Sequence, residues 1–441
     1  MLFIMMALFG SVTVNEVSLD ASILDNVQDE WIAPGYEIAE EIIIDPLDYG
    51  VPQDDRDGTP RIIGFQSFFV QTPEGEKWRI VLTYDRKVVV LQEDAEQREF
   101  EVERSIRSMI NSKDGRYLII RFLDDYYSQQ TMAISGLAPP EKRTLLINID
   151  EEIQSVRTGI EWISYLGGNG YGVASRGDSI YFYDDRLNLV NTRFNKLAHV
   201  LNNSTSLSND GSLFVTLYAD SFEVYEEGLS SLRAYDCNGN VLWDAEPAGI
   251  GRPGVSEHGD FVFALGQDRL VSLDGRTGLL LWEQPFENRS SFFAASLYGA
   301  GCSFKSDLSP AGVRENPDRE RALYVATTNI DGNSKFSRIS FSSRSIRFFY
   351  PSAVNATGSS LWQAVLGERL EYSNFLLCLF LDTGELLYSR RISKLGYLLN
   401  GHGGKADYLP QESIDSIAKK IIWFDGSVIH ILTLEKEGIS E

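Results

Sequence analysis

Four histidines are the residues best suited by type to acid–base catalysis or metal binding. They are His199, His258, His402 and His430. No two are four residues apart and no HExxH occurs, so a zinc-binding helix of that kind is excluded. His430 alternates within VIHILTL as a strand residue does. The glycines around His402, in NGHGG, would let a ligand approach the backbone, but a plain loop is the preferred interpretation.

Asp236, Asn238 and Asn240 form D-x-N-x-N, which resembles the start of a calcium-binding loop. The glycine expected next and the closing glutamate are missing, because Val241 and Leu242 follow. Asp and Asn side chains also hydrogen-bond the backbone of tight turns. We therefore predict a hairpin turn here rather than a metal site.

The remaining acidic groups lead to the same interpretation. Asp184 and Asp185, in FYDDRLN, would form an equivalent turn. Asp54, Asp55 and Asp57 lie in a proline-rich segment that is typical of a loop or linker. We predict no metal site and no cofactor, and the sequence assigns no catalytic residue.

The three cysteines, Cys237, Cys302 and Cys378, are too far apart for a CxxC metal or redox motif. One disulfide in an oxidising compartment stays open as an alternative, and Cys378, in FLLCLFL, is expected to be a small buried apolar residue. No GxSxG elbow, P-loop or Rossmann fingerprint is present.

The chain of 441 residues carries 63 acidic and 40 basic side chains, a net charge of −23. Such a surface repels nucleic acid and anionic lipid, so a nucleic-acid partner is not expected. Residues 1–14, MLFIMMALFGSVTV, match the apolar core of a signal peptide and are too short for a membrane span, which needs about 20 residues. We expect an exported protein, periplasmic or extracellular, without a membrane span. A cytoplasmic location is the alternative.

The elements that would position these residues are β-strands. From residue 61 onward, apolar runs recur at intervals of about 8 to 12 residues across short polar turns, which is typical of an all-β protein. Two hairpins share one pattern, LRAYDCNGNVLW at 232–243 and LVSLDGRTGLLLW at 270–282. We expect their final residues, Trp243 and Trp282, to pack between neighbouring sheets rather than to stack on a ligand.

A glycine repeat predicts the architecture. Gly115, Gly211, Gly259 and Gly358 each end a small polar segment before a strand, at intervals of 96, 48 and 99 residues. These intervals are close to two, one and two units of about 48 residues, and a unit of that size with four strands predicts a β-propeller. If the gaps in this series are counted as further units of about 48 residues, the chain has eight blades, with seven as the alternative.

The last unit lacks an outer strand of its own. Residues 36–45, YEIAEEIIID, read as a strand that would supply it, because pairing the two chain ends removes the open edges of the ring. The predicted organisation is a signal-like segment (1–14), an extension with the closing strand and a linker (15–60), the propeller (61–434) and a tail (435–441).

The segments LDGRTGLLLW, YDCNGNVLW and LDTGELLY resemble the repeat of PQQ-like, quinoprotein-type propellers, and NSKDGRYLII and LSNDGSLFV resemble WD40-like repeats. The resemblance implies a propeller over residues 61–434. Cofactor-using quinoproteins carry a vicinal cysteine pair, which this chain lacks, and only Trp243 and Trp282 end the repeat in tryptophan, with Tyr388 as a substitute. No functional residue is carried over from the family.

Two functions remain open. The first is a monomeric, non-catalytic binding module whose long loops, at 218–230, 302–320 and 401–415, recognise a protein or an extracellular ligand. The alternative is a propeller enzyme, either a quinoprotein-type oxidoreductase or a hydrolase, with its site in the central channel.

Overall fold

The computed structural model is all-β over the residues that it describes. These are residues 12–19, 30–54, 58, 60–73, 75–112, 114–122, 143–158, 163–198, 205–208, 210–220, 231–245, 253–255, 258–265, 269–285, 292–297, 300–304, 321–328, 334–341, 346–357, 360–369, 374–380, 386–392, 411–412, 419–424 and 427–438. They include one short 3-10 helix, η1 (Pro46–Tyr49), and no α-helix. None of their helical segments is long and apolar enough to cross a membrane.

The first five sheets each contain four antiparallel strands. Sheet 1 is β4 (Gly64–Thr72), β5 (Gly75–Tyr84), β6 (Lys87–Gln92) and β7 (Arg98–Glu101). Sheet 2 is β8 (Ile106–Asn111), β9 (Tyr117–Phe122), β10 (Arg143–Asn148) and β11 (Ile153–Thr158). Sheet 3 is β12 (Ile163–Leu166), β13 (Gly172–Arg176), β14 (Ser179–Tyr183) and β15 (Leu189–Phe194). Sheet 4 is β16 (Thr205–Leu207), β17 (Leu213–Tyr218), β18 (Ser231–Asp236) and β19 (Val241–Ala245). Sheet 5 is β20 (Pro253–Val255), β21 (Phe261–Leu265), β22 (Arg269–Asp274) and β23 (Leu280–Pro285).

Three further sheets combine the two ends of the chain. Sheet 6 has the order β25 (Ala300–Phe304), β24 (Phe292–Leu297), β26 (Arg321–Thr328), β27 (Ser334–Phe341) and β1 (Val12–Leu19). Sheet 7 has the order β28 (Ile346–Thr357), β29 (Ser360–Arg369), β30 (Asn374–Phe380), β31 (Leu386–Ile392) and β2 (Glu30–Ile32). Sheet 8 has the order β32 (Gln411–Glu412), β33 (Lys419–Phe424), β34 (Ile429–Lys436) and β3 (Tyr36–Ile44).

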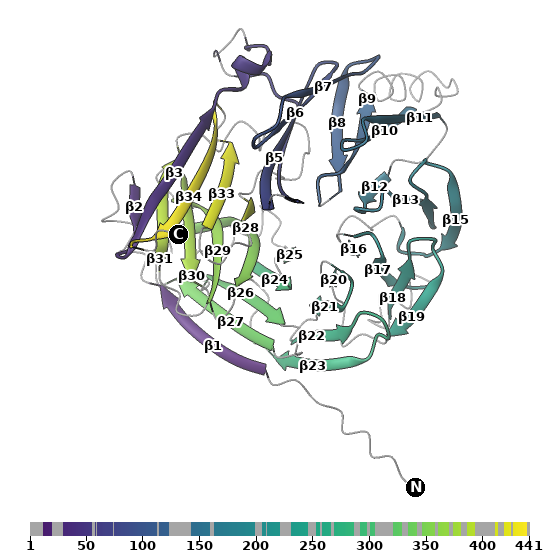
Figure 1. Ribbon diagram of the computed structural model, residues 1–441. Coiled ribbons are helices and arrows are strands. Elements are labelled where there is room, and N and C mark those ends of the chain that lie inside the picture. Colours follow the sequence, from purple (N-terminus) through teal and green to yellow (C-terminus); the bar gives the residue numbers. More distant parts are fainter. Residues whose placement is uncertain are drawn as a thin grey trace.

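The sheets follow one another around a common centre (Figure 1), an arrangement consistent with a β-propeller. Their innermost strands face this centre and contact the neighbouring sheet: β8 contacts β4 and β12, β20 contacts β16 and β25, and β32 contacts β28 and β4. The chain therefore runs through the sheets in order, as the repeat of about 48 residues predicts.

The N-terminal segment lies along the outer edges of three successive sheets. β1 pairs in parallel with β27, and β2 and β3 pair antiparallel with β31 and β34. The pairing of β3 with β34 is the one predicted for residues 36–45. β1 begins at Val12, inside the segment that the sequence reads as signal-like.

The structure corrects the expectation of four strands in every blade. Sheets 6 and 7 have five strands, because β1 and β2 add to their outer edges. Sheet 6 also departs from a simple meander, since β24 pairs in parallel with β26 and β25 takes the innermost place.

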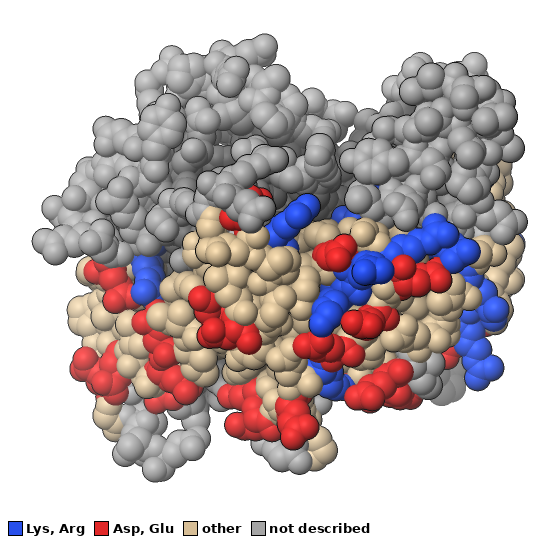
Figure 2. Space-filling model, turned by 90° about the horizontal axis from the view of Figure 1, so that it is seen from above, with Lys and Arg blue, Asp and Glu red and all other residues tan. Residues whose placement is uncertain are grey.

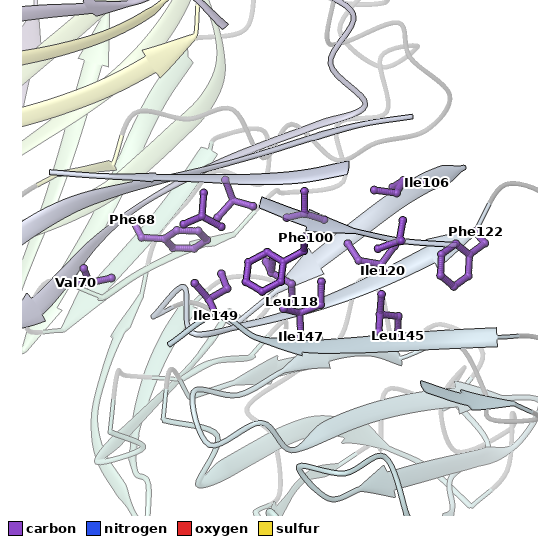
Figure 3. Close-up of a cluster of buried hydrophobic side chains, with 14 residues drawn as sticks. Phe68, Val70, Phe100, Ile106, Leu118, Ile120, Phe122, Leu145, Ile147 and Ile149 are labelled. Carbon is purple, nitrogen blue, oxygen red and sulfur yellow. The ribbon is translucent and has the colours of Figure 1, made fainter. Parts of the chain in front are cut away.

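The hydrophobic core lies between sheets, so consecutive residues of one strand serve different interfaces. In β9, Leu118 and Ile120 pack against sheet 1 whereas Ile119 packs against sheet 3. This explains why YLIIRF reads as a continuous apolar run instead of an alternating one. Figure 3 shows the interface of sheets 1 and 2, where Phe68 and Phe100 lie among the aliphatic side chains of β9 and β10.

The repeated glycines occupy the turn between the first and second strands of a sheet. Gly115, Gly170, Gly211 and Gly259 all have a positive φ, between 69° and 79°. At each of them a Cβ would collide with the preceding sheet: the obstructing residues are Phe68, Tyr117, Asn169 and Leu213, respectively. Gly358 lies outside the described residues. The repeat therefore marks a sheet-to-sheet contact that leaves no room for a side chain.

We predict that Gly115→Ala lowers stability far more than Gly177→Ala. Both glycines have a positive φ, but a Cβ at Gly115 would lie 2.6 Å from Phe68, whereas no atom lies within 4 Å of one at Gly177. We expect Gly177→Ala to cost about 1 kcal/mol from the backbone alone, and Gly115→Ala about 3 kcal/mol because of the added overlap. Urea unfolding of the two variants measures this difference, and equal losses would contradict the steric explanation.

Candidate interaction surface

The residues that the sequence singles out for chemistry do not assemble into one site. His258 lies in a turn before β21 and His430 in β34, whereas His199 and His402 lie outside the described residues. Within the described ranges, no three His, Cys, Asp or Glu side chains come together as metal ligands. The loops predicted to bind a ligand, at 218–230, 302–320 and 401–415, also lie largely outside those ranges.

The three cysteines lie in separate sheets. Cys237 follows β18, and Cys302 and Cys378 lie in β25 and β30. Burial raises the pKa of the Cys237 thiol, and the negative charge of Asp236 raises it further. This thiol is therefore protonated at neutral pH and is a weak nucleophile.

The hairpin turns use the Asp side chains as the sequence predicts. Asp236 accepts a 2.8 Å hydrogen bond from the backbone N–H of Asn240 and a 2.9 Å bond from its side-chain amide. Asp184 and Asn188 repeat both bonds at the same distances one sheet earlier. The D-x-N-x-N pattern is therefore confirmed as a turn whose carboxylate is committed to the backbone.

Side chains of the fourth strands tie each of these turns to the preceding sheet. In four successive pairs of sheets, such a side chain donates a hydrogen bond to a carbonyl at the turn before the next sheet's fourth strand. The pairs are Arg98 with Ile149 (2.7 Å), Arg157 with Arg186 (3.3 Å), Arg193 with Gly239 (2.7 Å) and Trp243 with Gly275 (2.8 Å). The last bond confirms that Trp243 packs between sheets, and Trp282 is also buried.

The same fourth strands expose apolar side chains immediately after the turns. These residues are Leu189 and Val190 in β15, Val241 and Leu242 in β19, and Leu279 and Leu280 at the start of β23. Leu279 is 68% exposed and Leu280 is 53% exposed. We call these six residues the apolar rim. Exposed aliphatic side chains that recur where the fourth strands of three neighbouring sheets begin are typical of a protein-binding surface.

The residues of the apolar rim lie in the segments LNLVN, NVLW and GLLLW. From the sequence alone, these apolar runs predict buried strands, not an exposed surface. Among the described residues, β15, β19 and β23 each pair with a strand on one edge only, so the residues that lead into them stay exposed. Burial resumes at Trp282 and at Trp243, and Trp243 reaches the next sheet.

A polar cluster fixes the N-terminal strands at the outer edge. Arg390 of β31 pairs with Glu41 of β3 at 2.5 Å and lies 3.7 Å from Glu30 of β2. The Tyr388 hydroxyl donates a 2.7 Å hydrogen bond to Glu30, and His430 Nδ1 lies 3.4 Å from Glu41. The cluster therefore joins sheets 7 and 8 through two strands that come from the N-terminal segment.

Burial alone would raise the pKa of Glu41, but the hydrogen bonds and charges of Arg390 and His430 outweigh it and lower the pKa below 4.5. A lowered folded-state pKa means that the ionised carboxylate stabilises the fold. This contribution is present above the unfolded-state value and is lost as the pH falls through the folded-state pKa.

Comparisons with known proteins do not assign this chain to a family. No family model matches it, and no curated protein matches it. Among solved structures, it is similar to the β-propeller domain of Cps50 (Swd1) from Myceliophteria thermophila, with 11% identity and a TM-score of 0.37 over 84% of this chain and 98% of that one. A likeness this distant carries no argument, so the architecture rests on the strand pairing of this chain itself.

We predict that Glu41→Gln removes part of the acid sensitivity of the protein. At neutral pH the free energy of unfolding of the variant should be lower than that of wild type by about 1 kcal/mol or less, because the ion pair is partly exposed. Below the folded-state pKa of Glu41 the two proteins should converge, since the wild-type carboxyl is then protonated too. Melting temperatures across an acid pH series measure this, with Glu37→Gln on the same strand as the exposed control. If the difference in melting temperature between wild type and Glu41→Gln stays constant with pH, the stabilising role of the Glu41 carboxylate is contradicted.

Proposed function

We propose that this chain is an exported, closed eight-bladed β-propeller that binds a protein partner and catalyses no reaction. The observation that supports partner binding best is the apolar rim, because three neighbouring sheets expose aliphatic side chains where their fourth strands begin. Export is proposed from the apolar run at residues 1–14.

Closure of the ring is supported by the contact between its last and first sheets. Phe424 of β33 stacks on Phe65 of β4 with ring centroids 5.6 Å apart, in a buried cluster that includes Ile44 of β3 and Ile80 of β5. Sheet 8 thus packs on sheet 1 in the same way as sheet 1 packs on sheet 2. Seven blades remain the alternative.

The charge of the chain favours a basic partner over nucleic acid. The net charge is −23, and Figure 2 shows acidic and basic side chains interspersed over one face of the described residues. Several of the basic groups are already paired, as Lys87 is with Glu99 at 3.1 Å and Lys196 with Asp178 at 2.6 Å. The excess negative charge would attract a cationic surface.

We predict that serine at Val241, Leu242, Leu279 and Leu280 weakens partner binding but leaves the fold intact. These side chains are exposed, so the melting temperature should change little. Proteins retained by the immobilised wild-type chain should be retained at least about tenfold less by the variant, since each leucine that loses its contact weakens binding. Ile43→Ser, which alters an exposed apolar residue of β3, is the control. Retention of the same proteins by all three chains would refute the role of the apolar rim.

The alternative function, a quinoprotein-type oxidoreductase or a hydrolase, has its own test. Titration of the purified chain with pyrroloquinoline quinone and calcium should show no saturable binding. Stoichiometric binding of the quinone together with oxidation of an alcohol or a sugar would replace the binding-module proposal.

A further inference from the structure

Each of the three sheets that carry the apolar rim has an aspartate beside an exposed aliphatic residue. The pairing of the third strand with the fourth ends at one exposed residue of the rim in each sheet: Leu189, Val241 and Leu280. The third-strand residue opposite it is followed in the chain by an aspartate in all three sheets: Asp184, Asp236 and Asp274. Residues opposite one another on paired strands are close neighbours, so each carboxyl group borders the apolar rim.

Hydrogen bonds within the turns hold these three carboxylates in place. Asp184 and Asp236 accept the bonds of the Asp–Asn turns described above. Asp274 accepts bonds at Oδ1 from the backbone N–H groups of Arg276 and Thr277 and from the Thr277 hydroxyl, at 3.1, 2.8 and 2.7 Å. All of these donors are neutral groups. The bonds therefore orient the carboxylates without cancelling their negative charge.

The three carboxylates keep their charge. Among the residues that the structure describes, no salt bridge reaches any of them, and Arg276, in the same turn as Asp274, pairs with Asp260 at 3.3 Å instead. Burial would raise the pKa of Asp184, but the hydrogen bonds of its turn and the nearby charge of Arg186 lower it below 3.8. Asp184 is therefore ionised at neutral pH.

The apolar rim and the three aspartates form one surface with two requirements. β15, β19 and β23 follow one another along the outside of the ring (Figure 1). Their exposed aliphatic side chains favour a partner that covers them with apolar groups, because this removes both surfaces from water. A carboxylate that loses water in the same contact opposes binding unless the partner supplies a cation. The surface therefore fits a partner that carries basic side chains beside apolar ones.

We propose that the apolar rim together with Asp184, Asp236 and Asp274 binds a basic, amphipathic segment of a partner protein. Apolar side chains of the segment cover the rim, and its Lys or Arg side chains pair with the three aspartates. This inference rests on the proposed protein-binding function and names the chemistry of the partner and the residues that recognise its cations.

The same charges oppose the other occupants of such a surface. A second copy of the chain would bring three further aspartates to the contact, and each copy has a net charge of −23. Nucleic acid and anionic membranes carry dense negative charge and are repelled in the same way.

The test measures the affinity of the purified chain for a fluorescent synthetic peptide of leucine and lysine. Asparagine at Asp184, Asp236 and Asp274 keeps an oxygen that accepts the turn bonds, so the melting temperature should change little. We expect this variant to bind the peptide about tenfold more weakly at low salt, because three exposed ion pairs are lost. The difference from wild type should shrink as salt screens the charges.

A matched control removes the same number of charges elsewhere. Glutamine replaces the exposed residues Glu37 and Glu40 of β3 and Glu96 before β7, which lie in sheets 8 and 1 rather than in sheets 3 to 5. This control should bind the peptide almost as wild type does, because distant surface charges are screened. Peptides with glutamate in place of lysine, or with serine in place of leucine, should each bind at least about tenfold more weakly.

Four results would overturn the proposal. The first is equal weakening by the asparagine and glutamine variants, which would indicate attraction by net charge alone. The second and third are undiminished binding of the glutamate peptide or of the serine peptide. The fourth is a dimer of the chain alone that dissociates when Leu279 and Leu280 are replaced by serine, because a second copy would then cover the apolar rim.

The two proposals fail in different ways. If the asparagine variant retains the partner proteins that the serine variant of the apolar rim loses, the partner is not recognised through its cations. This inference is then wrong and the binding function stands. If the serine variant retains every protein that wild type retains, the binding function of the apolar rim itself is wrong.

Discussion

The absence of room for a Cβ at the first turn of sheets 2 to 5 is the constraint on which the packing of successive sheets depends. Phe68 lies against Gly115, and Leu213 lies against Gly259, so each turn sits on a side chain of the sheet before it. These turns also need a left-handed backbone, which glycine adopts without steric cost. One residue type therefore satisfies a local and a long-range requirement at once, and its spacing fixes the distance along the chain from sheet to sheet.

Hydrogen bonds strengthen the same contacts where apolar packing ends. Arg79 is buried in sheet 1, donates to the Gly115 carbonyl at 3.0 Å and pairs with Asp150 of sheet 2 at 2.6 Å. Farther out, Arg193 and Trp243 reach carbonyls of the following sheets. A buried carbonyl without a partner would cost about 1 to 3 kcal/mol. The stability of each of these sheets therefore depends on the hydrogen-bond donor that the preceding sheet supplies.

The sequence predicted the parts of the fold that repeat. The glycine spacing and the Asp–Asn turns led to all-β sheets in chain order, because a short motif reports on its own turn and on the contact it must make. The strand at residues 36–45 was found from its apolar content. β1 and β2 were missed, since VTVNEVSL and EWI carry no regular alternation and form strands only because β27 and β31 offer them an edge.

The candidate surface was harder to predict than the fold. NVLW and GLLLW look alike whether their first residues are buried or exposed, and only the position of a fourth strand at the rim decides between the two. The cluster of Glu30, Glu41 and Arg390 joins residues about 350 positions apart, so no local pattern could indicate it.

The most direct test of this account is the melting temperature of the chain that lacks residues 1–45. If both chain ends complete the ring, removing β1 to β3 exposes the outer edges of sheets 6, 7 and 8 and weakens the packing of sheet 8 on sheet 1. The account predicts a fall of more than about 10 °C, because several kcal/mol of strand pairing and burial are lost. An unchanged melting temperature would contradict it.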